Sequence, residues 1–386
     1  MPQRPINFGI IGCGLMGREF ASAAARWCHL LDQTAHPQIF GVCDANPAAM
    51  RWYQDNFPSI KIASADYQDL LNSLEIDAIY CAVPHNLHQQ IYVDIVNAGK
   101  HLLGEKPFGI DQAANTSILA AIDARPDVLV RCASEFPFFP GAQRVVNLVQ
   151  SGQVGEIIGV EAGFLHSSDL DPNKPINWKR RIATNGEYGC MGDLGMHVLH
   201  VPLRLGFRPV NVRALLSKIV RERPGKDSVL EACETWDNAT LACEAEYNGS
   251  AFPMVLETKR IAPGETNTWF LRVFGTRLSA EFTTKQPKTL KTLPYMPGGV
   301  QAWHSEDLGS QSVHPTLTGG IFEFGFSDSI LQMWAAFCTE FADRDSGSSR
   351  FICATPAETR QSHALFTAAL ESQRTTQVVS VGDPAH

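Results

Sequence analysis

The chain begins with an apolar run, residues 6–11, that leads into a glycine-rich turn and then into an alanine-rich segment. The turn, residues 12–17, reads GCGLMG and has its glycines at the first, third and sixth positions. In a strand-turn-helix fingerprint, the first glycine allows the tight turn, the second lets a pyrophosphate approach the backbone, and the third lets the helix pack closely on the strand. The alternative is a glycine turn without a nucleotide, but the predicted strand and the predicted helix at 18–31 favour the fingerprint. The predicted cofactor contacts are Gly12, Gly14, Leu15, Met16 and Gly17.

An acidic residue follows the next predicted strand, residues 38–43, at Asp44. A carboxylate in this place can accept both hydroxyls of an adenosine ribose, and it repels a 2′-phosphate. We therefore expect NAD as the cofactor, with NADP possible because Asn46 or Arg51 could accommodate a phosphate. The alternative is that Asp44 is a solvated turn residue in the sequence DANP.

Helical and strand-like segments then alternate up to about residue 134, as a parallel sheet requires. We expect further helices at 47–57, 67–74, 86–98 and 112–124, and further strands at 60–63, 77–82, 101–103 and 128–132. Together with the first two strands, these make six. The sequence predicts an α/β domain over residues 1–134, a Rossmann doubly wound parallel sheet that binds NAD(P).

The pattern changes after residue 134, where strand-like runs are no longer separated regularly by helices. The segment FPFFP at 136–140 is a stiff connector into this part of the chain. We expect strands at 156–165, 210–220, 239–247, 254–258 and 269–275, a helix at about 192–205, a surface excursion at 285–312, and a closing helix and strand at 356–373 and 377–381. Residues 135–386 are thus predicted to form an α+β domain with a mainly antiparallel sheet.

Composition excludes several classes of protein. The 386 residues exceed the usual size of one core, carry a net charge of −8, and contain no basic run longer than Lys179-Arg180-Arg181. We therefore expect two domains and no nucleic-acid partner. No apolar stretch approaches the length of a membrane span and no leader is evident, so we expect a cytoplasmic protein without a membrane contact. The ten cysteines include no C-x-x-C pair and are expected to be reduced; only Cys13, in the glycine turn, attracts attention.

Two local signals fall where strands of the first domain end. Pro84 starts a turn after the fourth strand, and His88 lies in the first turn of the next helix, where it either faces the ligand crevice or packs against the sheet. Glu105 and Lys106 precede Pro107 at the end of the fifth strand. A lysine there can donate a hydrogen bond to a substrate oxygen and stabilise a developing alkoxide, although a lone lysine beside a proline is ordinarily a solvated residue.

A third signal lies on the helix of the second domain, where Asp193 and His197 are four residues apart. On a helix they share one face, so the carboxylate can orient the imidazole, and a neutral histidine is a suitable base for an alcohol proton. Asp193, His197 and His200 could alternatively bind a metal. We expect no metal, because no other Cys/His cluster completes the set and hydride transfer needs none.

The succession of these motifs resembles the Gfo/Idh/MocA oxidoreductases, which include inositol and sugar dehydrogenases. It runs from the glycine turn through Pro84 and His88, the EKP sequence at 105–107 and the D-x-G-x-H sequence at 193–197, with GQVGE at 152–156 opening the second-domain sheet. The match spans nearly the whole chain. It implies an N-terminal Rossmann domain, a C-terminal domain whose large open sheet builds a homodimer or homotetramer, and a small-molecule substrate bound between the domains.

The resemblance also implies roles for individual residues. Lys106, Asp193 and His197 match the family's lysine, substrate-binding acid and general acid/base, and the Lys106-Pro107 bond is often cis. Trp178 and Lys179 are similar to a Trp-Arg/Lys element of the branch that includes levoglucosan dehydrogenases. Trp178 could stack on an apolar sugar face while Lys179 binds hydroxyls, and the alternative is a buried core tryptophan. The chain departs from the family at four positions, Val83, His85, Pro137 and His200, which affects the expected substrate and not the fold.

The sequence therefore predicts an NAD(P)-dependent dehydrogenase that acts on a secondary hydroxyl of a sugar, anhydrosugar, sugar acid or inositol. The predicted substrate-binding set is Lys106, Trp178, Lys179, Asp193 and His197, and the predicted cofactor-binding set also includes Asp44, Pro84, His88, Glu105 and Lys106. A regulatory protein of the same fold that binds the cofactor without turnover is the alternative from another class. Such proteins tend to lose the lysine or the histidine, and both are present here.

Overall fold

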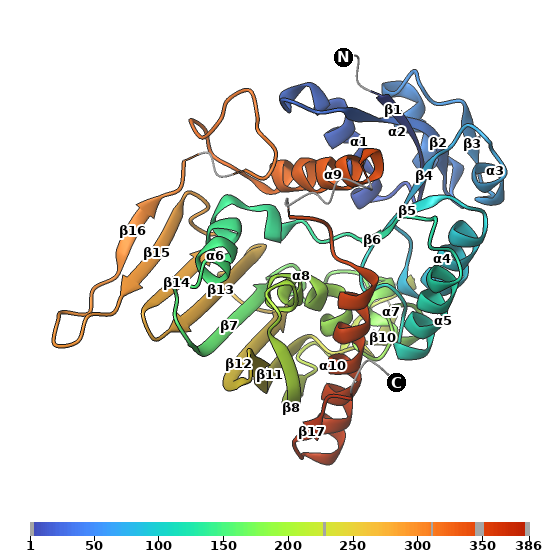
Figure 1. The fold of residues 1–386 in the computed structure, drawn as a ribbon. Helices are drawn as coiled ribbons and strands as arrows, with labels where there is room; N and C mark the ends of the chain where they lie inside the picture. The colour runs from blue at the N-terminus through green and yellow to red at the C-terminus, as the bar shows by residue number, and fades with distance from the viewer. Residues whose placement is uncertain (1–3, 227–228, 310–311, 344–350, 383–386) are drawn as a thin grey trace. The chain divides into compact units, whose positions relative to one another are not determined.

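The computed structural model describes residues 4–226, 229–309, 312–343 and 351–382. The chain forms two compact units (Figure 1). The first comprises Met1–Gly109, Ala113–Phe138 and Ser312–Pro356, and the second comprises Ile110–Gln112, Phe139–Gln311 and Ala357–His386. The sequence analysis assigns residues 312–356 to the second domain, but the chain returns to the first unit over this segment.

The first unit is built on a six-stranded sheet in which every neighbouring pair is parallel. The strand order is β3-β2-β1-β4-β5-β6. The strands are β1 Arg4–Ile11, β2 Ala35–Cys43, β3 Ile62–Ser64, β4 Ala78–Cys81, β5 His101–Gly104 and β6 Val130–Cys132. All four residues of β4 are buried, as expected for a strand covered on both faces. The predicted doubly wound parallel sheet is confirmed.

Helices connect these strands in the expected alternation. They are α1 Leu15–Ala25, η1 Trp27–His29, α2 Pro47–Asn56, α3 Gln68–Leu71, η2 His85–Leu87, α4 His88–Asn97, α5 Gln112–Asp123 and η3 Phe136–Phe138. The helix expected at 18–31 was wrong in both bounds, because α1 begins directly after Gly14 and ends at Ala25. The buried Trp27 side chain donates from Nε1 to the Ala35 carbonyl at 3.0 Å and ties this segment to β2.

The sequence analysis missed the long helix α9, Phe326–Ala342, which explains why the chain returns to the first unit. Its ten consecutive residues from 329 to 338 are all buried, so the helix has no polar face that would give a periodic signal. The Trp334 ring lies 4.7 Å from Phe8 of β1 and 4.9 Å from Phe20 of α1, measured between ring centroids. The core of the first unit is therefore completed by a segment about 300 residues away in the sequence.

The second unit contains a nine-stranded sheet with the order β16-β15-β14-β13-β7-β12-β11-β8-β17. Its only parallel pair is β7 with β12, so the predicted mainly antiparallel sheet is confirmed. The strands are β7 Ile157–Leu165, β8 Arg208–Ser217, β11 Asn238–Tyr247, β12 Ser250–Lys259, β13 Thr268–Gly275, β14 Leu278–Thr283, β15 Thr289–Pro294, β16 His304–Asp307 and β17 Val379–Ser380. A separate antiparallel pair is formed by β9 Glu222–Pro224 and β10 Leu230–Ala232.

The surface excursion expected at 285–312 was wrong for part of its length, because β15 and β16 form a hairpin that extends the sheet. Figure 1 shows this hairpin at one end of the sheet. The turn between the strands, residues 295–303, holds Pro297, Gly298 and Gly299, half of the Pro and Gly residues that suggested a loop. Leu290 of β15 is nonetheless fully buried, since its strand pairs with β14.

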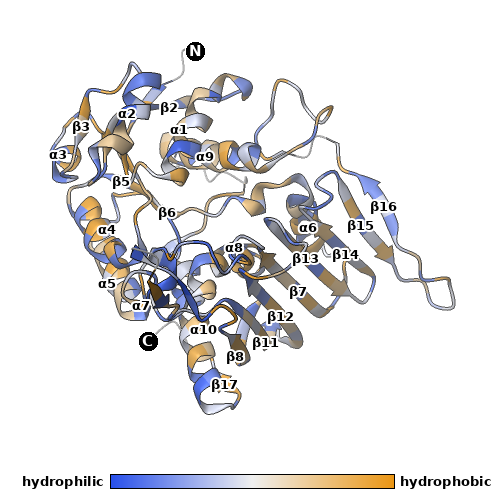
Figure 2. Cartoon of the chain, turned by 180° about the vertical axis from the view of Figure 1, so that it is seen from behind, coloured by the Kyte–Doolittle hydropathy of each residue, from blue (hydrophilic) through white to orange (hydrophobic). Residues whose placement is uncertain are grey.

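The helices of the second unit are α6 Pro140–Gln150, η4 Trp178–Arg180, α7 Ile182–Asn185, α8 Cys190–Arg204 and α10 Pro356–Thr375. Residues along β13 alternate between buried and half-buried, and Figure 2 shows the matching alternation of hydropathy along the strands. Helix α8 packs on β7, β11 and β12. A Cβ at Gly195 of α8 would lie 2.3 Å from the Phe366 ring of α10, so glycine is required where these two helices touch.

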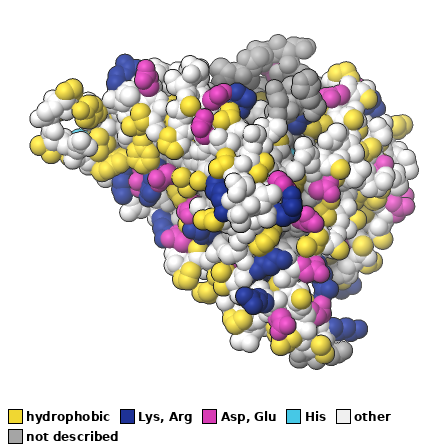
Figure 3. Space-filling model, turned by 90° about the horizontal axis from the view of Figure 1, so that it is seen from below, with side chains coloured by type: hydrophobic (Ala, Val, Ile, Leu, Met, Phe, Trp, Pro, Cys, Tyr) yellow, Lys and Arg dark blue, Asp and Glu magenta, His cyan; other side chains and the backbone are white. Residues whose placement is uncertain are grey.

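The surface carries both signs of charge. On the face shown in Figure 3, Lys and Arg side chains are interspersed with Asp and Glu side chains. Among the residues that the structure describes, no helix is long and apolar enough to cross a membrane.

Candidate active site

The glycine turn of the first unit has the geometry of a phosphate-binding loop. Gly12 has a φ of +96°, and a Cβ there would lie 2.3 Å from the Ala82 carbonyl oxygen, so only glycine fits. At Gly14, by contrast, nothing lies within 4 Å of the place a Cβ would take. This open face directly precedes α1, whose first amides are available to an anion. The turn therefore fits the diphosphate of a dinucleotide.

Asp44 lies at the carboxyl end of β2 and is joined to the glycine turn. Its Oδ2 accepts a hydrogen bond from the Cys13 N–H at 2.8 Å, and its Oδ1 accepts one from the Asn46 N–H at 2.8 Å. Each carboxylate oxygen can accept a further hydrogen bond, so Asp44 can still bind the two hydroxyls of a ribose. The neighbouring Cys13 is not a reactive thiol, because burial and then the Asp44 charge raise its pKa to about 12.

His88 is fully buried, although the analysis of the sequence allowed it to face the crevice. Its ring stacks on Tyr92 at 4.7 Å, its Nε2 lies 3.0 Å from the Val83 carbonyl oxygen, and its Nδ1 accepts from the Gly109 N–H at 3.5 Å. These contacts join the turn that contains Pro84 to the segment after Lys106. The geometry favours a histidine that shapes the backbone of the crevice, the second of the two interpretations.

Lys106 lies just beyond the carboxyl end of β5, and the Lys106-Pro107 peptide bond is cis, as the family resemblance implies. The preceding Glu105 is buried and accepts a hydrogen bond from the Tyr80 hydroxyl at 2.7 Å. A second buried acid, Glu135, lies nearby: burial and the Glu105 charge raise its pKa to about 8, while the Lys106 charge acts in the opposite direction. Lys106 thus belongs to a cluster with two buried carboxyl groups.

In the second unit, Asp193 occupies the first turn of α8 and is held by two cations. Lys179 Nζ lies 3.1 Å from Oδ1 and 3.0 Å from Oδ2, and Arg260 Nη2 lies 2.8 Å from Oδ2. The carboxylate is thus bound by the lysine and the arginine, and its expected role in orienting His197 stays a prediction. Two cations at this distance stabilise the ionised acid.

His197 lies one turn further along α8 and is buried. Its carbonyl oxygen accepts a hydrogen bond from Trp269 Nε1 at 2.9 Å, which fixes this part of the helix to β13. The His197 ring and the Phe164 ring of β7 are arranged edge to face, with their centroids 5.4 Å apart. The centroids of the Phe164 and His166 rings are 4.6 Å apart. His166, at the carboxyl end of β7, is a residue that sequence reasoning missed.

The other predicted residues of this region have varied surroundings. Trp178 is half-buried, and Lys179 Nζ lies 5.6 Å from its ring centroid. His200 is fully buried, with Nε2 at 3.2 Å from Arg204 Nη2, and Arg204 pairs with Glu358. His200 therefore belongs to a chain of contacts between α8 and α10. Within the described residues, no group of three or more His, Cys, Asp or Glu side chains could hold a metal ion.

Arg260 is the most informative residue that the sequence analysis missed. A signal was present, because the buried residues of β12 are even-numbered: Met254, Leu256 and Thr258 point inward, and the same parity places residue 260 inside. The expected strand ended at 258, so an arginine on the buried face was not considered. Its side chain is 2% exposed.

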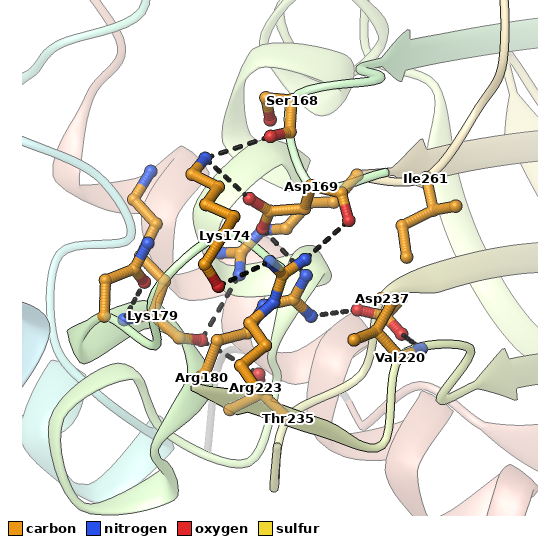
Figure 4. A network of polar contacts seen from close by, with 12 residues as sticks. Ser168, Asp169, Lys174, Lys179, Arg180, Val220, Arg223, Thr235, Asp237 and Ile261 are labelled. Atoms are coloured by element: carbon orange, nitrogen blue, oxygen red, sulfur yellow. Dashed lines mark hydrogen bonds and ion pairs between the residues drawn. The ribbon is translucent and has the colours of Figure 1, made fainter. Parts of the chain in front are cut away.

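Arg260 contacts Lys179 and Asp237, which belong to a larger polar network. Figure 4 shows part of this network around Lys179, Arg180 and Asp237. In this network, the buried Arg180 lies between Asp169, at 2.9 Å, and Asp237, with which it also forms an ion pair. Arg223 donates to the carbonyl oxygens of three residues, Asp169, Asp171 and Lys174. The 169–180 segment is thereby tied to Arg223 and Asp237.

The structure thus groups the predicted residues by unit. In the first unit, Gly12 and Gly14 belong to the glycine turn and Asp44 contacts it. Lys106 follows β5 of the same sheet. Asp193 and Lys179 are in contact in the second unit, on which Trp178 and His197 also lie.

Comparison with known proteins gives the family. The sequence model of an oxidoreductase family with an NAD-binding Rossmann fold, Gfo/Idh/MocA, matches residues 6–131, and that of the Gfo/Idh/MocA C-terminal domain matches residues 142–281. The chain belongs to the Gfo/Idh/MocA family. It is accordingly an NAD-binding oxidoreductase, and the resemblance drawn from its motifs is confirmed.

Individual relatives agree with this result. Levoglucosan dehydrogenase from Pseudarthrobacter phenanthrenivorans is 26% identical over 338 residues, which cover 83% of this chain and 82% of that protein. Inositol 2-dehydrogenase from Salmonella typhimurium is 20% identical over 169 residues, 44% of this chain and 48% of the relative. A solved structure of levoglucosan dehydrogenase in complex with NADH shares the fold, with a TM-score of 0.87, 22% identity, and coverage of 98% of this chain and 100% of that chain.

Proposed function

We propose that this oxidoreductase transfers a hydride between a nicotinamide cofactor and a secondary hydroxyl, or the corresponding ketone, of a sugar, anhydrosugar, sugar acid or inositol. The observation that carries the proposal is the arrangement at the start of α8. There a buried carboxylate is bound by a half-exposed lysine, one turn before a buried histidine. A carboxylate and an ammonium group are the partners that sugar hydroxyls require, and the relatives named as dehydrogenases act on levoglucosan and inositol.

The residues around the glycine turn would hold the cofactor. The open face at Gly14 and the amides of α1 suit the diphosphate, and Asp44 suits the ribose diol, which favours NAD over NADP. When bound, the nicotinamide supplies a hydride acceptor at C4. Leu15, 76% exposed beside the turn, and Met16 are the proposed side-chain contacts. Pro84, His88 and Glu105 would contribute by shaping the adjacent backbone.

The proposed roles follow from the surroundings of each residue. His197 accepts the proton of the reacting hydroxyl, since a neutral imidazole is a suitable base near neutral pH. Lys106 donates a hydrogen bond to the same oxygen and stabilises the charge that develops on it. Asp193, whose carboxylate is bound by Lys179 and Arg260, accepts a hydrogen bond from a neighbouring hydroxyl, and Trp178 offers its ring to the apolar face of the sugar. The proton and the hydride leave the carbinol together as it becomes a ketone.

The test is absorbance of reduced nicotinamide, with purified protein, NAD or NADP, and a panel of inositols, aldoses, anhydrosugars and sugar acids. We expect turnover with NAD on a subset of the panel and loss of turnover in a Lys106→Ala/His197→Ala variant. Tight cofactor binding without turnover on any compound would contradict the proposal and support the regulatory alternative.

We further propose a cytoplasmic homodimer or homotetramer that associates through the nine-stranded sheet. Its functional parts are the domains predicted at 1–134 and 135–386, amended by the return of residues 312–356 to the first unit. Leu215 and Ile158 support the assembly, since these large apolar side chains are 62% and 55% exposed on the sheet. Light scattering should give a mass of two or four chains, and Leu215→Glu should lower it. A monomeric mass for the unmodified protein would refute the assembly.

A further inference from the structure

Asp193 is held from two different sides, and only one of its two cations is accessible. The Lys179 side chain is 37% exposed and can reach a bound molecule. The Arg260 side chain is only 2% exposed, and its Nη2 lies 2.8 Å from Asp193 Oδ2. The carboxylate therefore has one buried cationic partner, Arg260, and one accessible partner, Lys179, which can also bind a ligand.

Arg260 also contacts the second partner of Asp193. Its Nη1 donates to the carbonyl oxygen of Lys179 at 3.2 Å, and the Thr235 hydroxyl donates to the same oxygen at 2.8 Å. A single guanidinium thus fixes both the carboxylate and the backbone of the lysine that binds it. A lysine cannot reproduce the two contacts, because its ammonium lacks the planar fork of an arginine.

The position of Arg260 is itself determined by the sheet. Residue 260 directly follows β12, and its N–H donates to the Asp237 carbonyl oxygen at 2.9 Å. The Asp237 carboxylate accepts from the amides of Ile219, at 2.5 Å, and Val220, at 2.9 Å, and pairs with Arg180. The backbone of residue 260 is therefore tied through Asp237 to the 219–220 segment and to Arg180 of η4.

We propose that Arg260 is the positioning residue of the active site: it fixes the Asp193 carboxylate and the Lys179 backbone in the geometry that receives the sugar. This inference rests on the proposed function and adds to it a residue for which neither the motifs nor the family resemblance gives a role. Its action is indirect, so removal of Arg260 should lower activity most when the Asp193 carboxylate is present to be positioned.

The test is a double-mutant cycle with Arg260→Gln and Asp193→Asn. We expect Arg260→Gln alone to lower kcat/KM by about 100-fold, since misplacement of a substrate-binding group by about 1 Å has an effect of this size. In the Asp193→Asn protein, the same change should lower kcat/KM by less than about 3-fold. Arg260→Lys should recover part of the activity, and it provides a second variant if the glutamine protein does not fold.

Arg223→Gln is the matched control. This buried arginine belongs to the same network, and in the described part of the chain its hydrogen bonds go to backbone carbonyls of the 169–174 segment. It should lower the melting temperature without changing the effect of Asp193→Asn on kcat/KM. If Arg260→Gln behaves like this control, or reduces kcat/KM equally with and without Asp193, Arg260 is a structural residue and the inference is overturned.

The cycle should also be measured on binding of the preferred polyol by calorimetry, which needs no turnover. Suppose that the wild-type protein oxidises no polyol, but that the effects of Arg260→Gln and Asp193→Asn on the polyol Kd depend on each other. This result would contradict the proposed function and support the inference. An active wild-type protein without such coupling would support the function and overturn the inference.

Discussion

The glycine turn of the first unit and the Asp193 region of the second unit are constructed in opposite ways. The turn is made of backbone from one short segment, and its essential features are a left-handed Gly12 and an open Gly14. The Asp193 region is made of charged side chains from η4, α8 and the end of β12, which are up to about 80 residues apart. A backbone site can be recognised from a local motif, whereas a site of paired side chains depends on which strands become neighbours.

The largest expected effect tests the side-chain site. His197→Ala should lower kcat by roughly 10²–10⁴-fold, the range for loss of a general base, because no proton acceptor would remain on α8 at that position. NADH affinity, measured by fluorescence titration, should stay within about 3-fold if the two regions act separately. His200→Gln is the control on the same helix, since His200 contacts Arg204. An equal loss of kcat in both variants would contradict the assignment.

The converse experiment tests the backbone site. Gly14→Val places a side chain in the open face of the turn and should weaken NADH binding by roughly 10–200-fold, the range for added methyl groups in a tight site. The melting temperature without cofactor should hardly change, because no atom lies within 4 Å of the new Cβ. Unchanged NADH affinity would place the diphosphate elsewhere.

A smaller effect is expected at Asp44, where a side chain assists the backbone site. Asp44→Ser removes the charge that repels a 2′-phosphate, and we expect the ratio of kcat/KM for NAD to that for NADP to fall by about 10-fold. Asp66→Ser is a suitable comparison, since this exposed acid accepts only a local hydrogen bond from the Gln68 amide among its described contacts. If the cofactor ratio did not change in Asp44→Ser, the acid would be the turn residue of the alternative interpretation.

The smallest effect concerns the buried acid near Lys106. The pKa of Glu135 is raised from 4.5 to about 8 in the folded protein, so this residue binds more protons when folded than when unfolded between these values. Its contribution to the free energy of unfolding is therefore present below pH 4.5 and is lost as the pH rises through about 8. From pH 6 to pH 9, the melting temperature of Glu135→Gln should fall by about 5 °C less than that of the wild type. Parallel curves would contradict the raised pKa.

Much of the first unit could be predicted because its signals are local. A strand, a glycine turn, an acid at the end of the next strand and a regular alternation of helices follow from residues that are neighbours in the chain. The same local information was insufficient for α9, which is buried on all sides and so lacks an amphipathic pattern. It also failed for the β15–β16 hairpin, where the composition of the turn obscured two short strands.

The sequence by itself determined the glycine fingerprint, the parallel sheet of the first unit and the mainly antiparallel sheet of the second. It also determined the candidates Lys106, Asp193 and His197, because each of these signals depends on local spacing in the chain. Only the tertiary structure decided what holds them. The parallel pairing of β12 with β7 and the packing of α8 on both strands bring Arg260 to Asp193. The stacking of His88 on Tyr92, likewise, could not be read from the sequence. Ion pairs between distant segments leave no periodic trace in a chain, since their energy depends on distance in space and not on separation in sequence.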